Sequence, residues 1–333
     1  MQNILDPAIL FFVFGVLAGT VKSNLEIPPA ISRFLSLYLL MALGLKGGFA
    51  LEKSGLTVEV ATGLAAAVAL AITVPLIGYA LLRRFLKGFD AAAIAATYGS
   101  VSAVTFVTAV QFLEHNHIAY GGHMAAAMAL MESPAIIMAV IFANSLRQQQ
   151  PEKITDQATQ HQASTPHKSS ASLSKILHES FTDGAQLLLL GAMAIGLMTG
   201  ESGQAAMQPF SGDLFKGMLS FFLLDMGLMT ARNFPQIKNQ PLWLIAYAVL
   251  GPLAHASVAL ALGWTLDLPL GDTTLLMVLA ASASYIAVPA VLRYAIPEAN
   301  PSLYFGLSLG VTFPLNILFG IPLYALCAQS ILS

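Results

Sequence analysis

YGSVSAVTF, residues 98–106, sets two serine hydroxyls close together in the middle of an otherwise apolar run. A second segment, ASASYIAVP at residues 281–289, does the same in the second half of the chain. Small residues with hydroxyl groups allow a helix to break and to turn its free N–H groups toward a cavity. Non-helical backbone is tolerated at membrane depth only where it is buried in protein or lines such a cavity. The two segments therefore predict a pair of broken membrane helices around a polar cavity.

The composition around these segments is that of a membrane protein. Of 333 residues, 56% are hydrophobic and only 10% are charged, against about 25% charged residues in soluble domains. A span needs roughly 20 apolar residues to cross the hydrocarbon, so we expect an all-α protein with ten transmembrane helices. The apolar runs that we assign to these spans cover residues 6–22, 28–48, 56–82, 90–113, 119–145, 175–199, 213–231, 240–265, 271–294 and 301–331.

One hydrophilic segment interrupts these runs. Residues 146–172 are rich in Gln, Ser, Thr and His, so we predict a flexible aqueous linker. It separates a first repeat of five spans, residues 1–145, from a second repeat of five, residues 173–333. With the N-terminus outside, eleven of the fifteen Lys and Arg residues fall in inside loops and three in outside loops, as the positive-inside rule demands. We therefore expect a bacterial plasma membrane protein with both termini outside and the linker in the cytoplasm.

An odd number of spans per half means that the second half enters the membrane from the opposite side. LSLYLLMALGL at residues 35–45 resembles LSFFLLDMGL at 219–228, each on the second span of its half. The two Ser-x-Ser segments lie on the fourth spans, and MESP (131–134) and VTFP (311–314) place a proline on each fifth span. Three matches in the same order predict an inverted repeat, a plan common among secondary transporters.

The predicted helix breaks suit a small anion. A helix N-terminus carries roughly half a positive charge and unpaired N–H donors, and in an inverted repeat two such ends can face each other at the membrane midplane. The alternative is that the small residues only allow helices to pack closely, but the matched pair favours a site. The residues that we expect to bind substrate are Ser100, Val101, Ser102, Ala103, Ser282, Ala283, Ser284 and Tyr285.

A carboxylate beside the first of the two prolines predicts a cation site. Glu132 is costly in lipid and is therefore a functional candidate, and Pro134 frees a backbone carbonyl near it. A structural pair between this carboxylate and a hydroxyl is the alternative. Asp225, the other carboxylate that we place inside the membrane, either serves transport or pairs with a neighbouring polar group. The residues that we expect to contribute oxygens to a Na⁺ site are Thr105, Glu132, Ser133, Thr312 and Asn316.

The sequence gives no support for enzyme chemistry or for ATP-driven pumping. It contains no P-loop, no GxSxG and no HExxH. The single cysteine, Cys327, excludes a disulfide framework and a cysteine metal cluster. We therefore expect no enzyme activity and no cofactor beyond a coupling ion, and we assign no role to His123 or His255.

Several segments of the chain are similar to the sodium-dependent bicarbonate transporter family of cyanobacteria. The similarity covers both repeats and excludes the linker, and IPEANPS at residues 296–302 is its most specific part. It implies ten spans in two inverted halves, a mobile core that moves against a gate or trimerisation domain, and Na⁺-coupled import of bicarbonate. The segments that carry it are GLKGG (44–48), YGSVSAVTF (98–106), MESPA (131–135), GPLAHA (251–256), the stretch 281–306 and FPLNI (313–317).

The resemblance also implies roles and partners. Bicarbonate would lie between the two broken spans, so that the serines of both Ser-x-Ser segments bind it. The protein would form a homotrimer, and a small PII-like regulator docks on the cytoplasmic face of some members. Two positions depart from the best-known members: Tyr285 replaces an aspartate, and Glu132 replaces a shorter aspartate. These departures leave the substrate and the ion stoichiometry open.

Energetics independently favour cation coupling. Importing a monovalent anion against an inside-negative potential costs about 2.3 kcal/mol per 100 mV, and a symported cation offsets that cost. We therefore predict a secondary active symporter of Na⁺ and bicarbonate that works by alternating access. The alternatives are a carrier of another small anion such as an organic carboxylate, a cation/proton exchanger of related architecture, and a passive channel.

Overall fold

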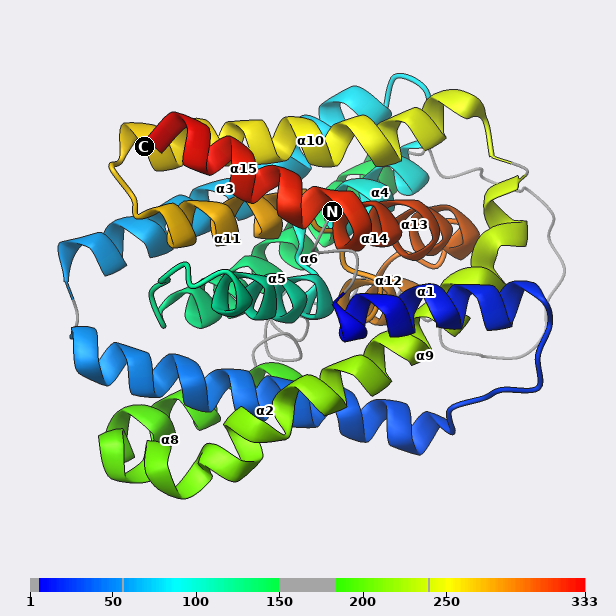
Figure 1. The fold of residues 1–333 in the computed structure, drawn as a ribbon. Helices are drawn as coiled ribbons and strands as arrows, with labels where there is room; N and C mark the ends of the chain where they lie inside the picture. The colour runs from blue at the N-terminus through cyan, green and yellow to red at the C-terminus, as the bar shows by residue number, and fades with distance from the viewer. Residues whose placement is uncertain (1–5, 56, 150–183, 239, 333) are drawn as a thin grey trace, which may run out of the picture.

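The computed structural model describes residues 6–55, 57–149, 184–238 and 240–332, and every regular element within these ranges is a helix (Figure 1). The predicted all-α fold class is therefore confirmed for the described part of the chain. Most of the predicted linker, from residue 150 on, lies outside the described residues, as does the second repeat up to residue 183.

The described helices fall into two sets, one on each side of the linker. The first set is α1 (Pro7–Thr20), α2 (Pro29–Ser54), α3 (Val58–Leu82), α4 (Gly88–Gly99), α5 (Ala103–His115) and α6 (Met124–Gln149). The second set is α8 (Gly184–Met207), α9 (Phe215–Lys238), α10 (Leu242–Thr265), α11 (Leu270–Ala281), α12 (Ala287–Ala295), α13 (Pro301–Leu307), α14 (Phe313–Leu315) and α15 (Ile321–Leu332). Short π-helical turns join α8 to α9 and connect α13, α14 and α15 into one continuous run.

Local sequence explains where several of these helices begin and end. Asp6 Oδ1 accepts a hydrogen bond from the amide of Ala8 at 2.8 Å, which caps α1. Thr57 caps α3 in the same way through the amide of Val60. α2 ends at Ser54. The next residue, Gly55, has a φ of 73°, a backbone conformation that glycine adopts without steric cost.

Two apolar runs that we predict as single spans are each divided into two helices. α4 ends at Gly99 and α5 begins at Ala103, so the three residues between them are non-helical. α11 ends at Ala281 and α12 begins at Ala287, which leaves five residues between helices. The first break needs its glycine, because a Cβ on Gly99 would lie 2.6 Å from the ring of Pro75 on α3. A side chain at this position would push α3 away from the break.

Two groups of helices make up the tertiary structure. α1 packs along α9 and α2 along α8, and α2 also contacts α9, so these four helices form one layer that we call the panel. The remaining helices, α3 to α6 and α10 to α15, pack mainly among themselves, and we call them the core. In Figure 1 the panel helices α2, α8 and α9 lie along the lower side, while α3, α10 and α15 lie on the opposite side. Both broken helices belong to the core.

Glycines hold the panel together. A Cβ on Gly15 of α1 would lie 2.3 Å from a carbonyl oxygen of α9 and 3.1 Å from Gly227. A Cβ on Gly48 of α2 would lie 2.1 Å from a carbonyl oxygen of α8 and 2.9 Å from Gly196. Small residues let helix backbones approach closely in a membrane, where packing replaces the hydrophobic driving force. The α1–α9 and α2–α8 contacts are therefore built in the same way.

The lengths and composition of the helices are those of a multi-pass membrane protein. Seven helical stretches of the described residues are long and apolar enough to cross a membrane. One of them, Gly184–Lys238, contains both α8 and α9, and α1 and α11 are shorter apolar helices. The stretch that contains α4 and α5 is almost entirely buried, whereas only a minority of the residues of α10 are buried.

Candidate functional site

The two helix breaks lie next to each other inside the core and are joined by hydrogen bonds. The amide of Ser102 donates to Ser282 Oγ at 3.0 Å, and the amide of Ser284 donates to the carbonyl of Thr97 at 2.8 Å. Each bond links the first half of the chain to the second. The two segments that share a sequence pattern therefore meet in space.

The N-terminus of α5 keeps two hydrogen-bond donors open. Ser102 caps this helix, because its Oγ accepts from the amide of Thr105 at 3.2 Å and from the Thr105 hydroxyl at 3.0 Å. The amides of Ala103 and Val104 have no acceptor among the described residues. The first amides of a helix carry the positive end of its dipole and lack partners within the helix. This arrangement suits the binding of a small anion.

The N-terminus of α12 is built differently. Ser284 Oγ accepts from the amide of Val288 at 3.2 Å, and the next residue, Pro289, has no N–H to donate. Ile286 precedes the helix and makes no side-chain cap. Of the first three residues of α12, only Ala287 offers an amide that no described acceptor uses.

A cavity opens between the two breaks and the panel. Its volume is about 70 Å³, several times the roughly 10–15 Å³ that a single water molecule needs, so it has room for a small polyatomic anion. The panel helices α2 and α8 close one side of it. The residues that bring polar side chains or the start of α5 to the cavity wall are Ser36, Ser102, Val104, Glu132, Gln186, Ser284 and Tyr285.

Glu132 brings a carboxylate to this cavity from α6. Nε2 of Gln186, on α8, donates to Glu132 Oε2 at 2.7 Å, which connects the panel to the core beside the cavity. A carboxylate within a membrane helix is costly unless a cation, a proton or hydrogen bonds compensate its charge. Carboxylate oxygens are the ligands that hard cations prefer. We did not identify Gln186 from the sequence: it lies within the predicted span 175–199, and a lone neutral amide there does not indicate which residue it contacts.

The predicted substrate residues divide between the cavity wall and its support. Ser282 is engaged in support, since its Oγ also donates to the carbonyl of Leu279 at 2.9 Å. Those that line the cavity are Val101, Ser102, Ala103, Ser284 and Tyr285. Those buried behind it are Ser100, Ser282 and Ala283.

Two buried hydroxyls at the breaks lack a partner of good geometry. Ser100 Oγ and the Tyr285 hydroxyl make no hydrogen bond among the described residues. The Tyr285 ring is 3% exposed and packs against Phe313, with ring centroids 5.1 Å apart. The phenol therefore fills space between the second break and the fifth span of its half.

Two of the predicted cation residues lie near the first break. Thr105 is buried beside Ser102, and Glu132 lines the cavity. The side chain of Ser133, a third member of the predicted set, lies outside the described part of the structure. Only Thr105 and Glu132 can therefore be placed close to the cavity.

Thr312 and Asn316 lie elsewhere in the core and do not line the cavity. Thr312 Oγ1 donates to the carbonyl of Ala248 at 2.7 Å and lies 2.7 Å from the Tyr98 hydroxyl. Asn316 Nδ2 donates to the carbonyl of Ala281, the last residue of α11, at 2.8 Å. Both side chains connect neighbouring helices around the breaks, and the structure does not bring them together with Glu132.

Two further carboxylates are buried away from the cavity. Asp225 accepts a hydrogen bond from Ser32 Oγ, so the geometry favours the structural alternative for this residue. Asp272, which we did not count among the carboxylates inside the membrane, is 4% exposed at the start of α11. It accepts from the amide of Gly121 at 2.5 Å and lies 3.6 Å from His123 Nε2. Its position at the edge of an apolar run resembles that of an interfacial residue, so the sequence carries no signal for its burial.

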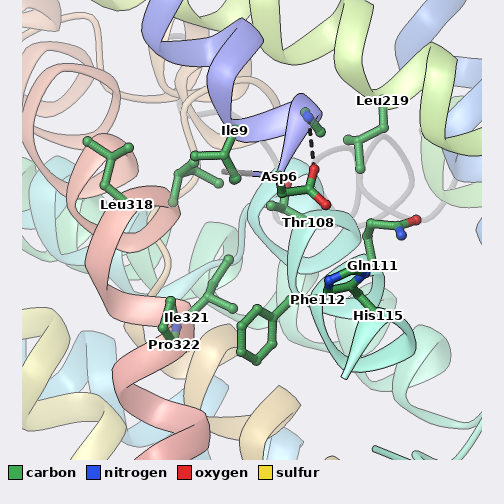
Figure 2. Close-up of a pocket in the computed structure, with 12 residues that line it drawn as sticks. Asp6, Ile9, Thr108, Gln111, Phe112, His115, Leu219, Leu318, Ile321 and Pro322 are labelled. Carbon is green, nitrogen blue, oxygen red and sulfur yellow. Dashed lines mark hydrogen bonds between the residues drawn. The ribbon is translucent and has the colours of Figure 1, made fainter. Parts of the chain in front are cut away.

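A second, smaller cavity lies between the panel and the core at the other end of α5 (Figure 2). It faces Thr108, Gln111 and His115, in the later turns of α5, whereas the first cavity faces the start of this helix. Its panel wall comes from α1 and α9 instead of α2 and α8, and Asp6 and Leu219 project toward it in Figure 2. These two cavities between the panel and the core thus lie near opposite ends of α5.

These features define a class of protein, a multi-pass all-α membrane protein in which two broken helices meet beside a polar cavity. A family model of the Na⁺-dependent bicarbonate transporter superfamily matches residues 7–329, nearly the whole chain. The chain belongs to this superfamily, and the resemblance inferred from its sequence segments is confirmed. The superfamily consists of transporters and not of enzymes. No curated protein sequence matches the chain significantly.

Proposed function

We propose that this protein is a symporter that imports bicarbonate together with Na⁺ by alternating access, with the anion bound between the two Ser-x-Ser breaks. The superfamily implies Na⁺ and bicarbonate as the transported species. The observation that carries the site is the pair of open amides on Ala103 and Val104, at the wall of a cavity that also holds hydroxyls from both breaks. Bicarbonate carries one negative charge and accepts several hydrogen bonds, so it matches these donors.

The coupling ion would bind close to the anion. Glu132 lines the same cavity as Ser102, and Thr105 is hydrogen-bonded to Ser102. A cation held by the Glu132 carboxylate would offset the charge of the anion, and each ion would favour the binding of the other. In this proposal Thr312 and Asn316 support the cation site from a distance through the positions of α4 and α11.

Ten spans in two inverted repeats, with residues 1–145 and 173–333 as the repeats, are part of the proposal. The described helices supply ten spans if α8 and α9 are counted separately, α1 is included, and α11 with α12 is taken as one broken span. Packing between the two halves supports the inversion. The first helix of the first half, α1, packs on α9, and the first described helix of the second half, α8, packs on α2. The two cavities support alternating access, because each lies at the panel–core boundary near a different end of α5.

The remaining parts of the proposal concern location and assembly. The distribution of Lys and Arg supports a bacterial plasma membrane protein with both termini outside and residues 146–172 in the cytoplasm. The family resemblance supports a homotrimer and a PII-like regulator on the cytoplasmic face. Light scattering of the purified protein in detergent tests the trimer, and protease access to the linker in oriented vesicles tests its side.

The decisive experiment is uptake of radiolabelled bicarbonate into proteoliposomes, with and without an inward Na⁺ gradient. Uptake that saturates, requires the gradient and, at low bicarbonate concentration, is strongly reduced in Ser102→Ala is the expected result. Uptake that does not saturate and ignores Na⁺ would identify a channel. If folded, reconstituted protein takes up no bicarbonate, the assignment fails, and formate and acetate are the next anions to test because Tyr285 changes the cavity wall.

A further inference from the structure

A large apolar groove runs along the outside of the core between α3 and α10. Its volume is about 460 Å³, larger than that of the substrate cavity. Gly78 on α3 and Gly251 on α10 face it, and the absence of side chains at these two positions deepens it. The two helices are in contact, and in Figure 1 α10 runs along the upper edge of the molecule while α3 rises obliquely toward it.

The walls of this groove are built to face hydrocarbon. Ile77 is 65% exposed and Leu250 is 61% exposed, and Leu81 and Val258 continue the same apolar surface. At membrane depth such a surface is covered by lipid acyl chains or by another protein. The groove lies between two helices, and its lining is almost entirely apolar, which suits a lipid acyl chain.

One end of the groove carries the signature of a membrane interface. The aromatic rings of Phe85 and Trp243 meet there with centroids 5.5 Å apart, where α3 has ended and α10 begins. Tryptophan is enriched at the level of lipid headgroups because its ring is apolar and its N–H is polar. This end of the groove is therefore where a lipid headgroup would sit.

Positive charge gathers at the same end. Arg83, Arg84 and Lys87 follow α3 directly, and all three are exposed. No carboxylate of the described residues forms an ion pair with any of them. Clusters of basic residues at the end of a transmembrane helix attract anionic lipid headgroups. The cluster thus complements a negative charge placed at the mouth of the groove.

We propose that this groove is a binding site for an anionic phospholipid. One acyl chain lies between Ile77 and Leu250, and the headgroup phosphate contacts Arg83, Arg84 and Lys87. A zwitterionic lipid fits the apolar walls equally well but has no net charge to match the basic cluster. The site therefore selects the lipid by its headgroup and holds it by its chain.

The site also has a connection to the broken helices. Tyr247 forms part of the groove floor, and its ring packs against Tyr98 of α4 with centroids 5.2 Å apart. The Tyr98 hydroxyl in turn lies 2.7 Å from Thr312 Oγ1. A bound lipid chain would therefore press on the helix that leads into the first break. The lipid site itself does not depend on which anion the protein transports.

The protein's two tryptophans provide a direct test. Trp243 lies in the groove, and Trp264 lies near the other end of α10. In Trp264→Phe, Trp243 is the sole tryptophan, and brominated acyl chains that touch it quench its fluorescence. The variant is reconstituted into phosphatidylcholine vesicles that contain a small fraction of either brominated phosphatidylglycerol or brominated phosphatidylcholine. We expect phosphatidylglycerol to quench Trp243 at least about threefold more strongly at equal mole fraction.

Three matched controls locate the effect. Trp243→Phe leaves Trp264 as the reporter, which should show no preference between the two lipids. Arg83→Gln with Arg84→Gln, in the Trp264→Phe background, should remove the preference while leaving quenching by phosphatidylcholine unchanged. Gly251→Leu should weaken quenching by both lipids, and it is tolerated because the added Cβ meets only ordinary contacts with the Tyr247 ring, at 3.6–3.8 Å.

Two outcomes in the Trp264→Phe protein alone would overturn the proposal. Equal quenching by the two lipids would mean that the groove takes acyl chains without selecting the headgroup. Absence of quenching by either lipid would mean that another protein surface, such as a second copy of this chain, covers the groove. Both results are obtained without the arginine or glycine variants, so the test is decisive even if one of those variants misfolds.

Discussion

The two helix breaks carry the same Ser-x-Ser pattern but end in unequal helix termini. At the first break, three non-helical residues lead into α5, which is capped by Ser102 and leaves the amides of Ala103 and Val104 open. At the second break, five non-helical residues lead into α12, where Ser284 occupies the amide of Val288 and Pro289 has none. Open helix-terminal amides are therefore concentrated on α5, and the second break contributes mainly shape and hydroxyls.

The far ends of the two broken helices differ as well. Near the end of α5, Glu114 pairs with Lys46 of the panel at 3.0 Å, so this helix is fastened across the boundary between panel and core. Beyond α12, Glu298 pairs with Arg147 of α6 at 2.8 Å, entirely within the core. If the core moves against the panel, the first contact has to break and the second is preserved. The helix that follows the first break, α5, thus carries both the open amide donors and the ion pair that would open during such a movement.

The largest effect is expected from Glu132→Gln, because Glu132 is the one carboxylate among the described residues that line the cavity between the two breaks. In the proposed function this change removes a ligand of the cation, while an amide contact can replace the hydrogen bond from Gln186. We expect Na⁺-dependent bicarbonate uptake to fall by about 100-fold, which corresponds to about 2.7 kcal/mol. The measurement is initial uptake in proteoliposomes over a range of Na⁺ concentrations.

Glu132→Asp is the matched control, since it keeps the charge and shortens its reach. It should retain Na⁺ dependence with a higher half-saturating Na⁺ concentration. Uptake by Glu132→Gln that still responds fully to Na⁺ would place the cation elsewhere in the protein. In that case the charge of Glu132 would have no part in binding the cation beside the two breaks.

The next effect separates the two breaks directly. Ser102→Ala removes a helix cap, a change that typically costs about 1 kcal/mol, together with a hydroxyl at the cavity. We expect the half-saturating bicarbonate concentration to rise about tenfold in this variant. Ser284→Ala removes a hydroxyl from a helix end with one open amide, and there we expect a rise of about twofold. Equal rises in both variants would mean that the anion is bound symmetrically and that the open amides of α5 have no special part.

The fold was largely accessible from the sequence because its signals are local. Apolar runs of spanning length predict the helices, and the positions of both breaks follow from hydroxyl residues in the middle of such runs. The π-helical turns around Thr312 and Asn316 carry no comparable signal, because they depend on how α13 to α15 pack. The burial of Asp272 depends in the same way on tertiary contacts, with His123 and Gly121.

The candidate site was accessible only in part. Residue types predicted that Ser102, Ser284 and Glu132 would be polar groups near a cavity, and all three line it. The inequality of the two breaks was not predictable, since it arises from which amides are already used. Gln186 was missed for a related reason, because its role depends on the approach of α8 to α6. Hydrogen-bond partners that are far apart in sequence leave no trace in a local pattern.

A smaller effect is expected from Tyr285→Phe. The hydroxyl has no partner of good geometry, so its removal should change the free energy of unfolding by less than about 1 kcal/mol. Tyr285→Ala should cost about 3–5 kcal/mol, because it leaves a cavity beside Phe313. Thermal unfolding in detergent compares the two, and uptake of bicarbonate by Tyr285→Phe should stay within about twofold of the unmodified protein. A complete loss of uptake in Tyr285→Phe would instead make the phenol a substrate ligand and raise the importance of the second break.

The smallest effect concerns the ion pair that fastens α12. Hydrogen bonding to Arg147 lowers the pKa of the Glu298 carboxyl below its ordinary value, and Glu298 lies in the turn after the helix. A depressed pKa means that the stabilisation is fully present above the unfolded pKa of about 4.5 and is lost as the pH falls through the lower folded value. An exposed pair of this kind contributes at most about 1 kcal/mol. Glu298→Gln should therefore lower the melting temperature by no more than about 4 °C near neutral pH.

The difference in melting temperature between Glu298→Gln and the unmodified protein should shrink toward zero as the pH falls below about 4.5. A difference that stays constant with pH would mean that the substitution acts through packing and not through charge. Because the pair with Arg147 lies within the core, transport at neutral pH should be unchanged in this variant. Glu114→Gln, which loosens the equivalent end of α5 from Lys46 of the panel, should change the transport rate. If both variants transport alike, the fastening of α5 to the panel is not a contact that opens during the cycle, and the two broken helices differ only in how they bind the anion.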